Sequence, residues 1–171
     1  MIVTLEYLEE LRKNTKGKIV LATGTFDLFH YEHLMYLEAA KKLGDVLVVA
    51  VKDNACARFK GPNRPFMDEE YRIAIVDAIR YVDYSVLVHF DDTAHPKIVY
   101  DNESQRQWLV MFEPVFELLK PDILYHEINP VLDDARTRVF DAYGITGVST
   151  VRLERVSTSK IVAKISKSIS A

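Results

Sequence analysis

The chain has 171 residues, of which 49% are hydrophobic and 27% are charged, and its formal net charge is -3. This length fits one compact domain with a full core, so we expect a single domain over residues 1–171. Acidic and basic residues are mixed along the sequence, which argues against a nucleic-acid partner or an anionic membrane. A small molecule is therefore the expected substrate.

The single cysteine, Cys56, cannot form an internal disulfide, and no apolar run approaches the roughly 20 residues that span a bilayer. No signal peptide is recognised at the first residues, so we expect a cytoplasmic protein in a reducing compartment. We interpret Cys56 as a small packing residue, because no catalytic constellation adjoins it in the sequence.

The first part of the chain predicts helices and strands in alternation. Apolar spacing indicates a short amphipathic helix over residues 4–13, then a buried strand over 18–22 and a helix that ends near Gly44. Another buried strand is expected over 46–51. Two continuous apolar strands joined through a helix predict a right-handed βαβ unit, and hence a parallel sheet.

The middle of the chain is less regular. Residues 52–65 are polar and rich in turn formers, and Asp68 is a candidate cap for the next helix. A strand is expected over 83–88, and residues 89–106 read as an irregular excursion.

The alternation resumes after this excursion. The expected elements are a helix over residues 107–119, a strand over 123–125, a helix over 133–143 stopped near Gly144, a strand over 147–152 and a terminal helix over 159–168. This order predicts an α/β fold, a Rossmann-like open parallel sheet with helices on both faces. Its ligand should lie beyond the carboxyl ends of the strands.

The segment GTFDLFHYEH, from Gly24 to His33, places His30 and His33 where a buried strand gives way to a helix. Backbone N–H groups in the first helical turn lack partners and the helix dipole favours negative charge, so we expect these histidines to contact phosphate. The alternatives are a structural pair of helix-start histidines or a metal site. No adjacent cysteine or carboxylate cluster resembles a zinc set.

This segment resembles the HxGH signature of the nucleotidyltransferase superfamily, in the version carried by glycerol-3-phosphate cytidylyltransferase and its relatives. One letter departs, because Glu32 stands where the family has glycine. The resemblance implies catalytic roles for His30 and His33, and nucleotide contacts for Thr25 and Phe26.

A second segment, residues 152–161, resembles the RTEGISTTKI of cytidylyltransferases, with Leu153 and Arg155 as departures. The resemblance implies that Arg152, Ser157 and Thr158 hold the β- and γ-phosphates of a nucleotide. The alternative for the two hydroxyl residues is ordinary capping of the helix that follows.

The loop FKGPNRP, residues 59–65, resembles the KGPGRP-type loop of sugar-phosphate adenylyltransferases. By this resemblance Lys60 should reach the reacting phosphates, and Arg72 the phosphate of the second substrate. A solvated loop lysine and an ion pair of Arg72 with Asp68 or Glu69 are the alternatives.

The strand exit at residues 126–129 departs from the relatives' KGGD, so the acceptor's identity cannot be carried over. The resemblance as a whole implies transfer of CMP or AMP from CTP or ATP to a small phosphorylated alcohol or sugar, with release of pyrophosphate. Mg²⁺ would accompany the nucleotide, with no metal held by the protein itself, and relatives are commonly dimers, so a homodimer is expected.

Two alternatives stay open at this stage. Glu32 favours a non-catalytic domain that acts as a regulatory or interaction module, with residues 89–106 as a contact surface. Synthesis of a flavin nucleotide is a further enzymatic possibility, since archaeal FMN adenylyltransferases share the HxGH-type architecture.

Overall fold

The structure, a computed structural model, describes residues 1–61, 63–151 and 157–169. Its centre is a six-stranded sheet in which all neighbouring strands are parallel, in the order β1-β4-β3-β2-β5-β6. The strands are β1 (Ile2–Val3), β2 (Ile19–Gly24), β3 (Val46–Lys52), β4 (Tyr84–Val88), β5 (Ile123–Glu127) and β6 (Thr146–Thr150). The predicted open parallel α/β sheet is therefore confirmed.

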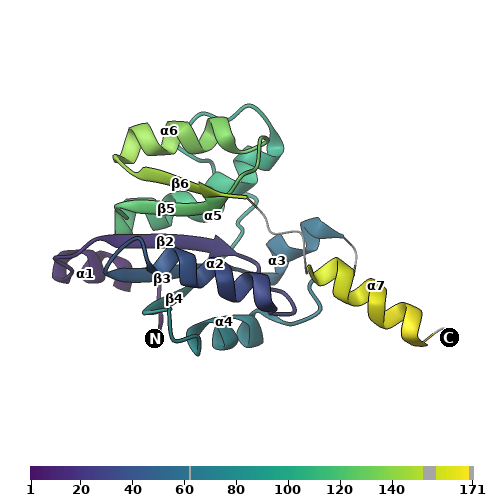
Figure 1. Cartoon of the computed structure of the whole chain (residues 1–171). Helices are drawn as coiled ribbons and strands as arrows, with labels where there is room; N and C mark the ends of the chain where they lie inside the picture. The colour runs from purple at the N-terminus through teal and green to yellow at the C-terminus, as the bar shows by residue number, and fades with distance from the viewer. Residues whose placement is uncertain (62, 152–156, 170–171) are drawn as a thin grey trace.

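Helices pack against both faces of this sheet (Figure 1). They are α1 (Tyr7–Asn14), α2 (Tyr31–Lys41), α3 (Asn54–Ala57), the 3-10 helix η1 (Arg58–Lys60), α4 (Glu69–Asp77), α5 (Glu103–Leu119), α6 (Asp133–Tyr143) and α7 (Thr158–Ile169). Helices α2 and α4 pack on one face, and α1, α5 and α6 pack on the other.

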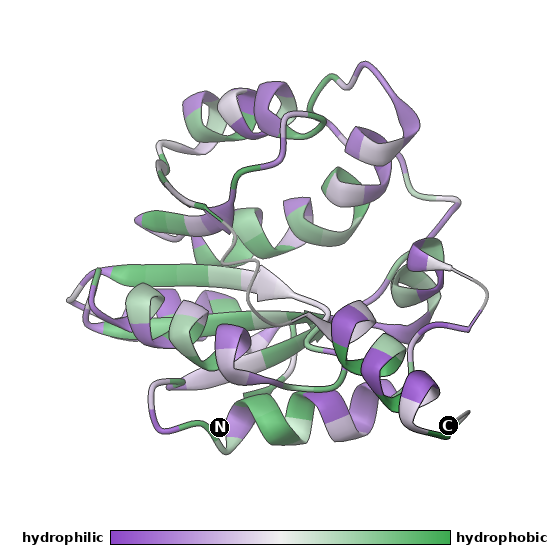
Figure 2. Cartoon of the chain, turned by 45° about the vertical axis from the view of Figure 1, so that its right-hand side comes forward, coloured by the Kyte–Doolittle hydropathy of each residue, from purple (hydrophilic) through white to green (hydrophobic). Residues whose placement is uncertain are grey.

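The central strand β2 shows why the sheet forms with two covered faces. Ile19 and Leu21 pack with α1 and α5, whereas Val20 and Ala22 pack with α2, and none of the four is exposed. Successive side chains of a strand point to opposite faces, so a strand buried on both sides needs a continuous apolar run. Figure 2 shows this pattern, with green strands inside and purple turns on the outer helices.

The sheet has a switch point beside β2. The chain runs from β2 to β3 and β4 on one side, and returns to β5 and β6 on the other. Ligands of open α/β sheets bind outside the carboxyl ends of the strands at such a point. Helix α7 covers neither face of the sheet and lies beyond those ends (Figure 1).

Several boundaries differ from the sequence expectations. Helix α5 begins inside the expected irregular segment, because Asn102 Oδ1 accepts a hydrogen bond from Gln105 N–H (3.0 Å) and caps the helix earlier. Strand β1 was not expected, since two residues carry no periodicity. The helix that was expected to end near Gly44 ends at Lys41, with Lys42 as its C-cap.

Other expectations are confirmed. Helix α6 has the expected bounds, and Gly144 ends it in the left-handed conformation (φ 66°) that favours glycine. Cys56 is buried in the core, and burial raises the pKa of its thiol, in agreement with a packing role. None of the helices within the described ranges is long and apolar enough to cross a membrane. The extent of the domain stays a prediction.

Candidate functional site

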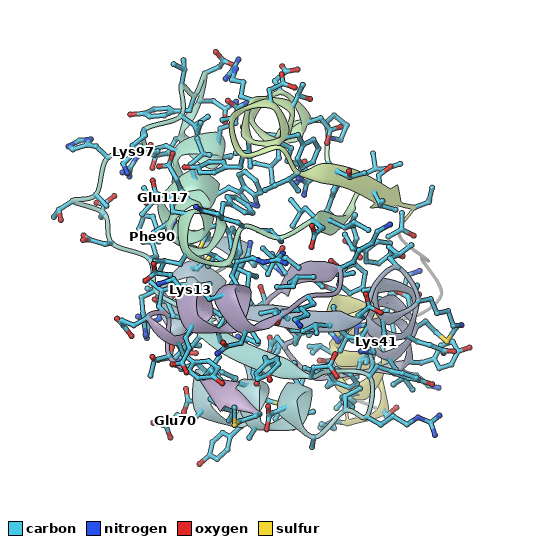
Figure 3. All side chains as sticks on the ribbon, turned by 90° about the vertical axis from the view of Figure 1, so that its left-hand side faces the viewer. Lys13, Lys41, Glu70, Phe90, Lys97 and Glu117 are labelled. Carbon is cyan, nitrogen blue, oxygen red and sulfur yellow. The ribbon has the colours of Figure 1, made fainter. Side chains whose placement is uncertain are left out.

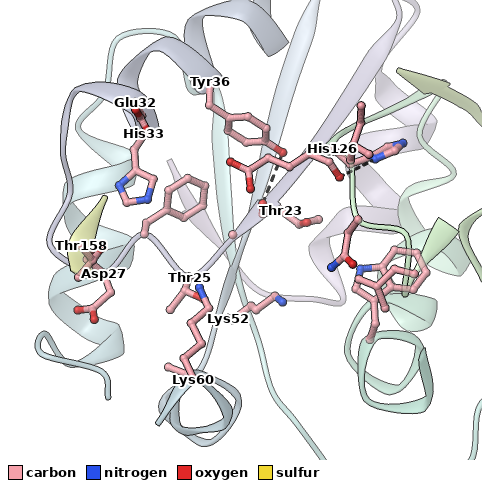
Figure 4. Close-up of a pocket in the computed structure, with 18 of the residues that line it drawn as sticks. Thr23, Thr25, Asp27, Glu32, His33, Tyr36, Lys52, Lys60, His126 and Thr158 are labelled. Carbon is pink, nitrogen blue, oxygen red and sulfur yellow. Dashed lines mark hydrogen bonds between the residues drawn. The ribbon is translucent and has the colours of Figure 1, made fainter. Parts of the chain in front are cut away.

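A cleft of about 670 Å³ opens at the carboxyl ends of β2 and β5, where the topology predicts a ligand. Its walls come from the loop after β2, the first turns of α2 and α7, η1 and the loop between β5 and α6. Figure 4 shows His33 and Thr158 on one side of this cleft and His126 on the other. Residues from both ends of the chain therefore meet in one space.

The turn between β2 and α2 has an unusual backbone. Phe26 (φ 54°) and Leu28 (φ 46°) adopt the left-handed conformation, which is uncommon for residues other than glycine. The Phe26 ring lies so close over Gly24 that a Cβ there would be 2.7 Å from two of its carbons. The same ring packs edge-on against His33, with centroids 5.3 Å apart. Phe26 therefore lines the cleft mainly as a support for His33.

The two histidines stack on each other at the start of α2. His30 is the N-cap residue, and its ring centroid lies 3.9 Å from that of His33. His33 Nδ1 accepts a hydrogen bond from the backbone N–H of His30 (3.3 Å). In the neutral ring the proton of His33 then sits on Nε2, which can donate to an anion in the cleft.

Asp27 is buried and organises the loop that follows η1. Its carboxylate accepts hydrogen bonds from the backbone N–H groups of Phe66 and Met67 and from Arg64 Nη1, each at 3.0 Å. Arg64 Nη2 in turn donates to Ser159 Oγ (3.1 Å) in the first turn of α7. Asp27 is thus engaged by the protein, and its role is to join three segments at the edge of the cleft.

The first turn of α7 is fastened to the same place. Thr158 Oγ1 donates to the backbone carbonyl of Asp27 (2.7 Å), and Thr158 lines the cleft. Ser157 Oγ instead accepts a hydrogen bond from Lys160 N–H (3.3 Å), which is the capping role weighed as the alternative. Arg152 lies outside the described residues. The predicted phosphate contacts of these residues stay predictions.

Arg72 does not line the cleft, although the sequence predicts that it binds the second substrate. Its side chain is fully buried and donates to the carbonyls of Thr25 (2.6 Å), Lys52 (2.7 Å) and Met67 (2.9 Å) and to Asn54 Oδ1 (2.9 Å). A guanidinium used in this way has no surface left for a substrate. The predicted contact does not fit this geometry, and Arg72 acts as a strut between the ends of β2 and β3.

Lys60 and Glu32 both line the cleft. Lys60 reaches up from η1 towards the loop after β2, and Glu32 lies beside His33 at the start of α2 (Figure 4). The predicted contact of Lys60 with the reacting phosphates stays a prediction. The carboxylate that replaces the family's glycine faces the same space as the histidines.

The opposite half of the cleft holds residues that the sequence did not single out as ligands. Lys52 ends β3, and its ammonium lies 5.5 Å from the centre of the Phe112 ring. Burial lowers the pKa of Lys52. The signal in the sequence was a single cation directly after a continuous apolar strand, at the end of the strand where ligands bind.

Arg136 and His126 complete this half. Arg136 Nη1 donates to the carbonyl of Glu127 (2.9 Å) and to Asp133 Oδ1 (3.2 Å), and the guanidinium lies 5.8 Å from the centre of the Trp108 ring. Burial lowers the pKa of His126, so this imidazole is neutral at pH 7. Nothing in the local sequence separates Arg136 from an ordinary arginine of an exposed helix.

Within the ranges that the structure describes, no group of three or more His, Cys, Asp or Glu residues is close enough to hold a metal ion.

The chain matches proteins of one family. Residues 21–164 match the family model described as cytidylyltransferase-like. The bifunctional protein HldE of Campylobacter jejuni (strain 81116) is 35% identical over 165 residues, which are 94% of this chain and 30% of that protein. HldE of Helicobacter pylori (strain HPAG1) is 37% identical over 124 residues, 72% of this chain and 23% of that protein. The chain thus spans less than a third of the length of these relatives.

Two solved structures are similar as well. The lipopolysaccharide core biosynthesis protein of Thermoplasma volcanium has a TM-score of 0.58 and 30% identity, and the match covers 81% of this chain and 99% of that one. The pantoate-beta-alanine ligase of Francisella tularensis has a TM-score of 0.67 at 14% identity, and the match covers 98% of this chain and 78% of that one. The second likeness concerns the fold alone.

Proposed function

This chain belongs to the cytidylyltransferase-like family, and from that premise we propose that it transfers AMP or CMP from ATP or CTP to a small phosphorylated sugar or alcohol. The observation that carries the proposal is one cleft lined by His33 at the start of α2 and by Thr158 at the start of α7. The two sequence segments that predict nucleotide binding thus contribute to the same space.

In the proposed reaction a phosphate oxygen of the acceptor attacks the α-phosphorus of the nucleotide in line. A new phosphorus–oxygen bond forms, the bond from the α-phosphorus to the bridging oxygen breaks, and pyrophosphate leaves with that electron pair. No covalent enzyme intermediate is needed. Such a reaction depends on positioning and on stabilising the charge of the phosphoryl oxygens.

The histidine half of the cleft supplies groups suited to that task. His33 lines the cleft with its Nδ1 accepting a backbone hydrogen bond, which orients the ring, and His30 is stacked against the same ring. We propose that both stabilise the α-phosphate in the transition state and that Lys60 neutralises the transferring group. Preorganised donors of this kind contribute strongly in a site shielded from water.

The leaving pyrophosphate is proposed to lie at the first turn of α7. The first turn of a helix and its dipole favour an anion, and Thr158 and Ser159 line the cleft at that point. Ser157 contributes by capping the helix, and Arg152 is proposed to add charge. Mg²⁺ bound with the nucleotide would neutralise part of the charge of the triphosphate.

Thr25 and Phe26 line the cleft and are proposed to border the nucleotide. ATP is the first nucleotide to test, because the loop at residues 59–65 resembles that of sugar-phosphate adenylyltransferases. A sugar phosphate is the first acceptor to test, since a relative at 30% identity is named for lipopolysaccharide core biosynthesis. A homodimer is proposed because relatives are commonly dimers. Analytical ultracentrifugation would test it by measuring the mass of the protein in solution.

Glu32 supports a second candidate, a domain that keeps the fold and serves as a regulatory or interaction module. The residue lines the cleft beside His33. A carboxylate about 4 Å from a phosphate charge costs on the order of 4 kcal/mol at an effective dielectric near 20. An effect of that size would weaken nucleotide binding by nearly a thousandfold.

One experiment separates the two candidates. The protein is incubated with ATP or CTP, Mg²⁺ and a panel of sugar and alcohol phosphates, and pyrophosphate release is measured. Glu32→Gly is assayed beside Glu70→Gly, a matched change in the first turn of α4 at an exposed glutamate (Figure 3). Pyrophosphate release by the unchanged protein supports the enzyme, and release only by Glu32→Gly identifies Glu32 as the block. If no protein binds nucleotide or releases pyrophosphate, the module is the better account.

A further inference from the structure

A second cavity, of about 330 Å³, adjoins the cleft between α3, η1 and α5. The two spaces share the lining residues Thr25, Lys52, Lys60, Trp108, Asn129 and Leu132, so one opens into the other. The cavity is large enough for a small ligand of the size that such sites usually hold. Ser104 and Gln107 on α5 add polar groups to its wall.

Lys52 stands at the junction of the two spaces. It is half-buried, and Figure 4 shows its side chain running from the strand end towards the side of the cleft where His126 lies. Its ammonium contacts the Phe112 ring, and within the described part of the chain no carboxylate lies within ion-pair distance of it. A cation taken out of water without a carboxylate partner is costly to the fold.

Arg136 is the second cation of this region. Only 6% of the residue is exposed, and its Nε atom is buried with no hydrogen-bond partner among the described residues. Lys52 and Arg136 both line the cleft, so the two groups face the same space. Asp133 pairs with Arg136 through Nη1. Among the described residues Asp133 therefore pairs with Arg136, and Lys52 has no carboxylate of its own.

The remaining charged and titratable groups around Lys52 come from four elements. They are Cys56 on α3, Lys60 on η1, and His126 and Glu127 at the end of β5, besides Arg136 on α6. Cys56 is a neutral thiol at pH 7 because burial raises its pKa, and His126 is neutral because burial lowers its pKa. Glu127 is exposed. The net charge of the groups around Lys52 is therefore positive.

We propose that this region is the acceptor site of the proposed transferase: Lys52 and Arg136 hold the acceptor's phosphate, and the body of a sugar phosphate occupies the second cavity beside Ser104 and Gln107. The inference rests on the proposed function. A phosphate dianion supplies the charge that two partly desolvated cations lack. Lys52 lines both spaces, so a phosphate held by it lies at the entrance to the cleft of the histidines.

The test uses the single tryptophan of the chain as its probe. Trp108 lines both spaces, so its fluorescence reports on a ligand in either one, and each aldose 1-phosphate is titrated both without ATP and at saturating ATP. Titrations with a panel of aldose 1-phosphates and with inorganic phosphate are run on the unchanged protein, Lys52→Met, Lys52→Arg and Lys13→Met. Lys13 forms an exposed ion pair with Glu9 on α1 and serves as the matched control (Figure 3).

We expect Lys52→Met to weaken the best acceptor by about 10- to 100-fold, as for loss of a charge-assisted hydrogen bond, with ATP affinity unchanged. Lys52→Arg should keep part of the acceptor affinity, and Lys13→Met should keep all of it. Binding of inorganic phosphate alone, at the same affinity as every sugar phosphate, would reject the sugar cavity.

The outcomes distinguish a failure of the acceptor site from a failure of the proposed transferase function. If ATP binds and pyrophosphate is released while Lys52→Met leaves the acceptor's KM unchanged, this inference is wrong and the proposed function stands. If Lys52→Met weakens ATP and acceptor equally, Lys52 belongs to the nucleotide side and the inference is again wrong. If the unchanged protein binds no nucleotide, the proposed function fails, whatever Lys52 does.

Discussion

The two halves of the cleft are built in opposite ways. On the histidine side several polar groups are held by other parts of the protein, as in the bonds of Asp27 to residues 64–67 and of Thr158 to Asp27. On the Lys52 side two cations face one region, and one buried nitrogen of Arg136 has no partner in the described chain. The loops of the first half are therefore fixed by hydrogen bonds within the protein, whereas the second half brings together two cations of which one, Arg136, is paired with a carboxylate. We therefore expect the histidine half to be rigid, and the charge of the Lys52 half to be balanced when an anion binds.

The sharpest test of the histidine half is His33→Ala. Loss of a preorganised donor to the transition state commonly lowers kcat by about 10²- to 10³-fold, and we expect a loss of that size in pyrophosphate release. The variant should unfold at nearly the same temperature, since His33 is half-buried at a helix start. Full activity in His33→Ala would show that His33 does not stabilise the transition state.

Arg72→Met tests what joins the halves, because Arg72 donates to the carbonyls of Thr25 on one side and Lys52 on the other. Buried carbonyls that lose a charged donor should cost about 3 kcal/mol of unfolding free energy, measured by urea denaturation. Arg80→Met, which removes an arginine that stacks on Tyr81 near the end of α4, is the control. Equal urea midpoints for the two variants would contradict the structural role of Arg72.

Thr158→Val tests the attachment of α7. The substitution removes the hydrogen bond to the Asp27 carbonyl (2.7 Å) with little change of shape. We expect a nucleotide affinity about 5- to 10-fold lower, as for a net hydrogen bond of roughly 1 kcal/mol, with acceptor affinity retained. Calorimetric titration with ATP measures it. A parallel loss of acceptor affinity would mean that the halves are coupled.

The smallest expected effect is a gain in stability in Lys52→Met. Burial lowers the pKa of Lys52 in the folded state, so between that pKa and the unfolded value of about 10.4 the unfolded chain binds more protons and stability rises with pH. The variant should therefore be more stable at neutral pH, by about 1 kcal/mol or roughly 2–4 °C in Tm. The gain should shrink as the pH rises towards 10, and a gain that is constant with pH would point to packing instead.

The two halves of the cleft also differ in how far the sequence alone predicts them. The histidine half follows from contiguous features, a continuous apolar strand and then a turn with His30 and His33 at fixed spacing, so local reasoning reaches it. Lys52 and Arg136 come from elements 84 positions apart, and only the strand order brings them to one region. Arg72 misled the sequence reading because a helical arginine usually faces water, and only tertiary packing buries it.

The Thr158–Asp27 hydrogen bond links positions 131 residues apart in the chain. Contacts between such distant positions close a long loop, so they form late when a domain folds. The parallel sheet can therefore assemble before the nucleotide side of the cleft exists. A fragment that stops short of α7 should keep the βαβ architecture in circular dichroism and yet bind no triphosphate, which would make nucleotide binding a reporter of completed folding.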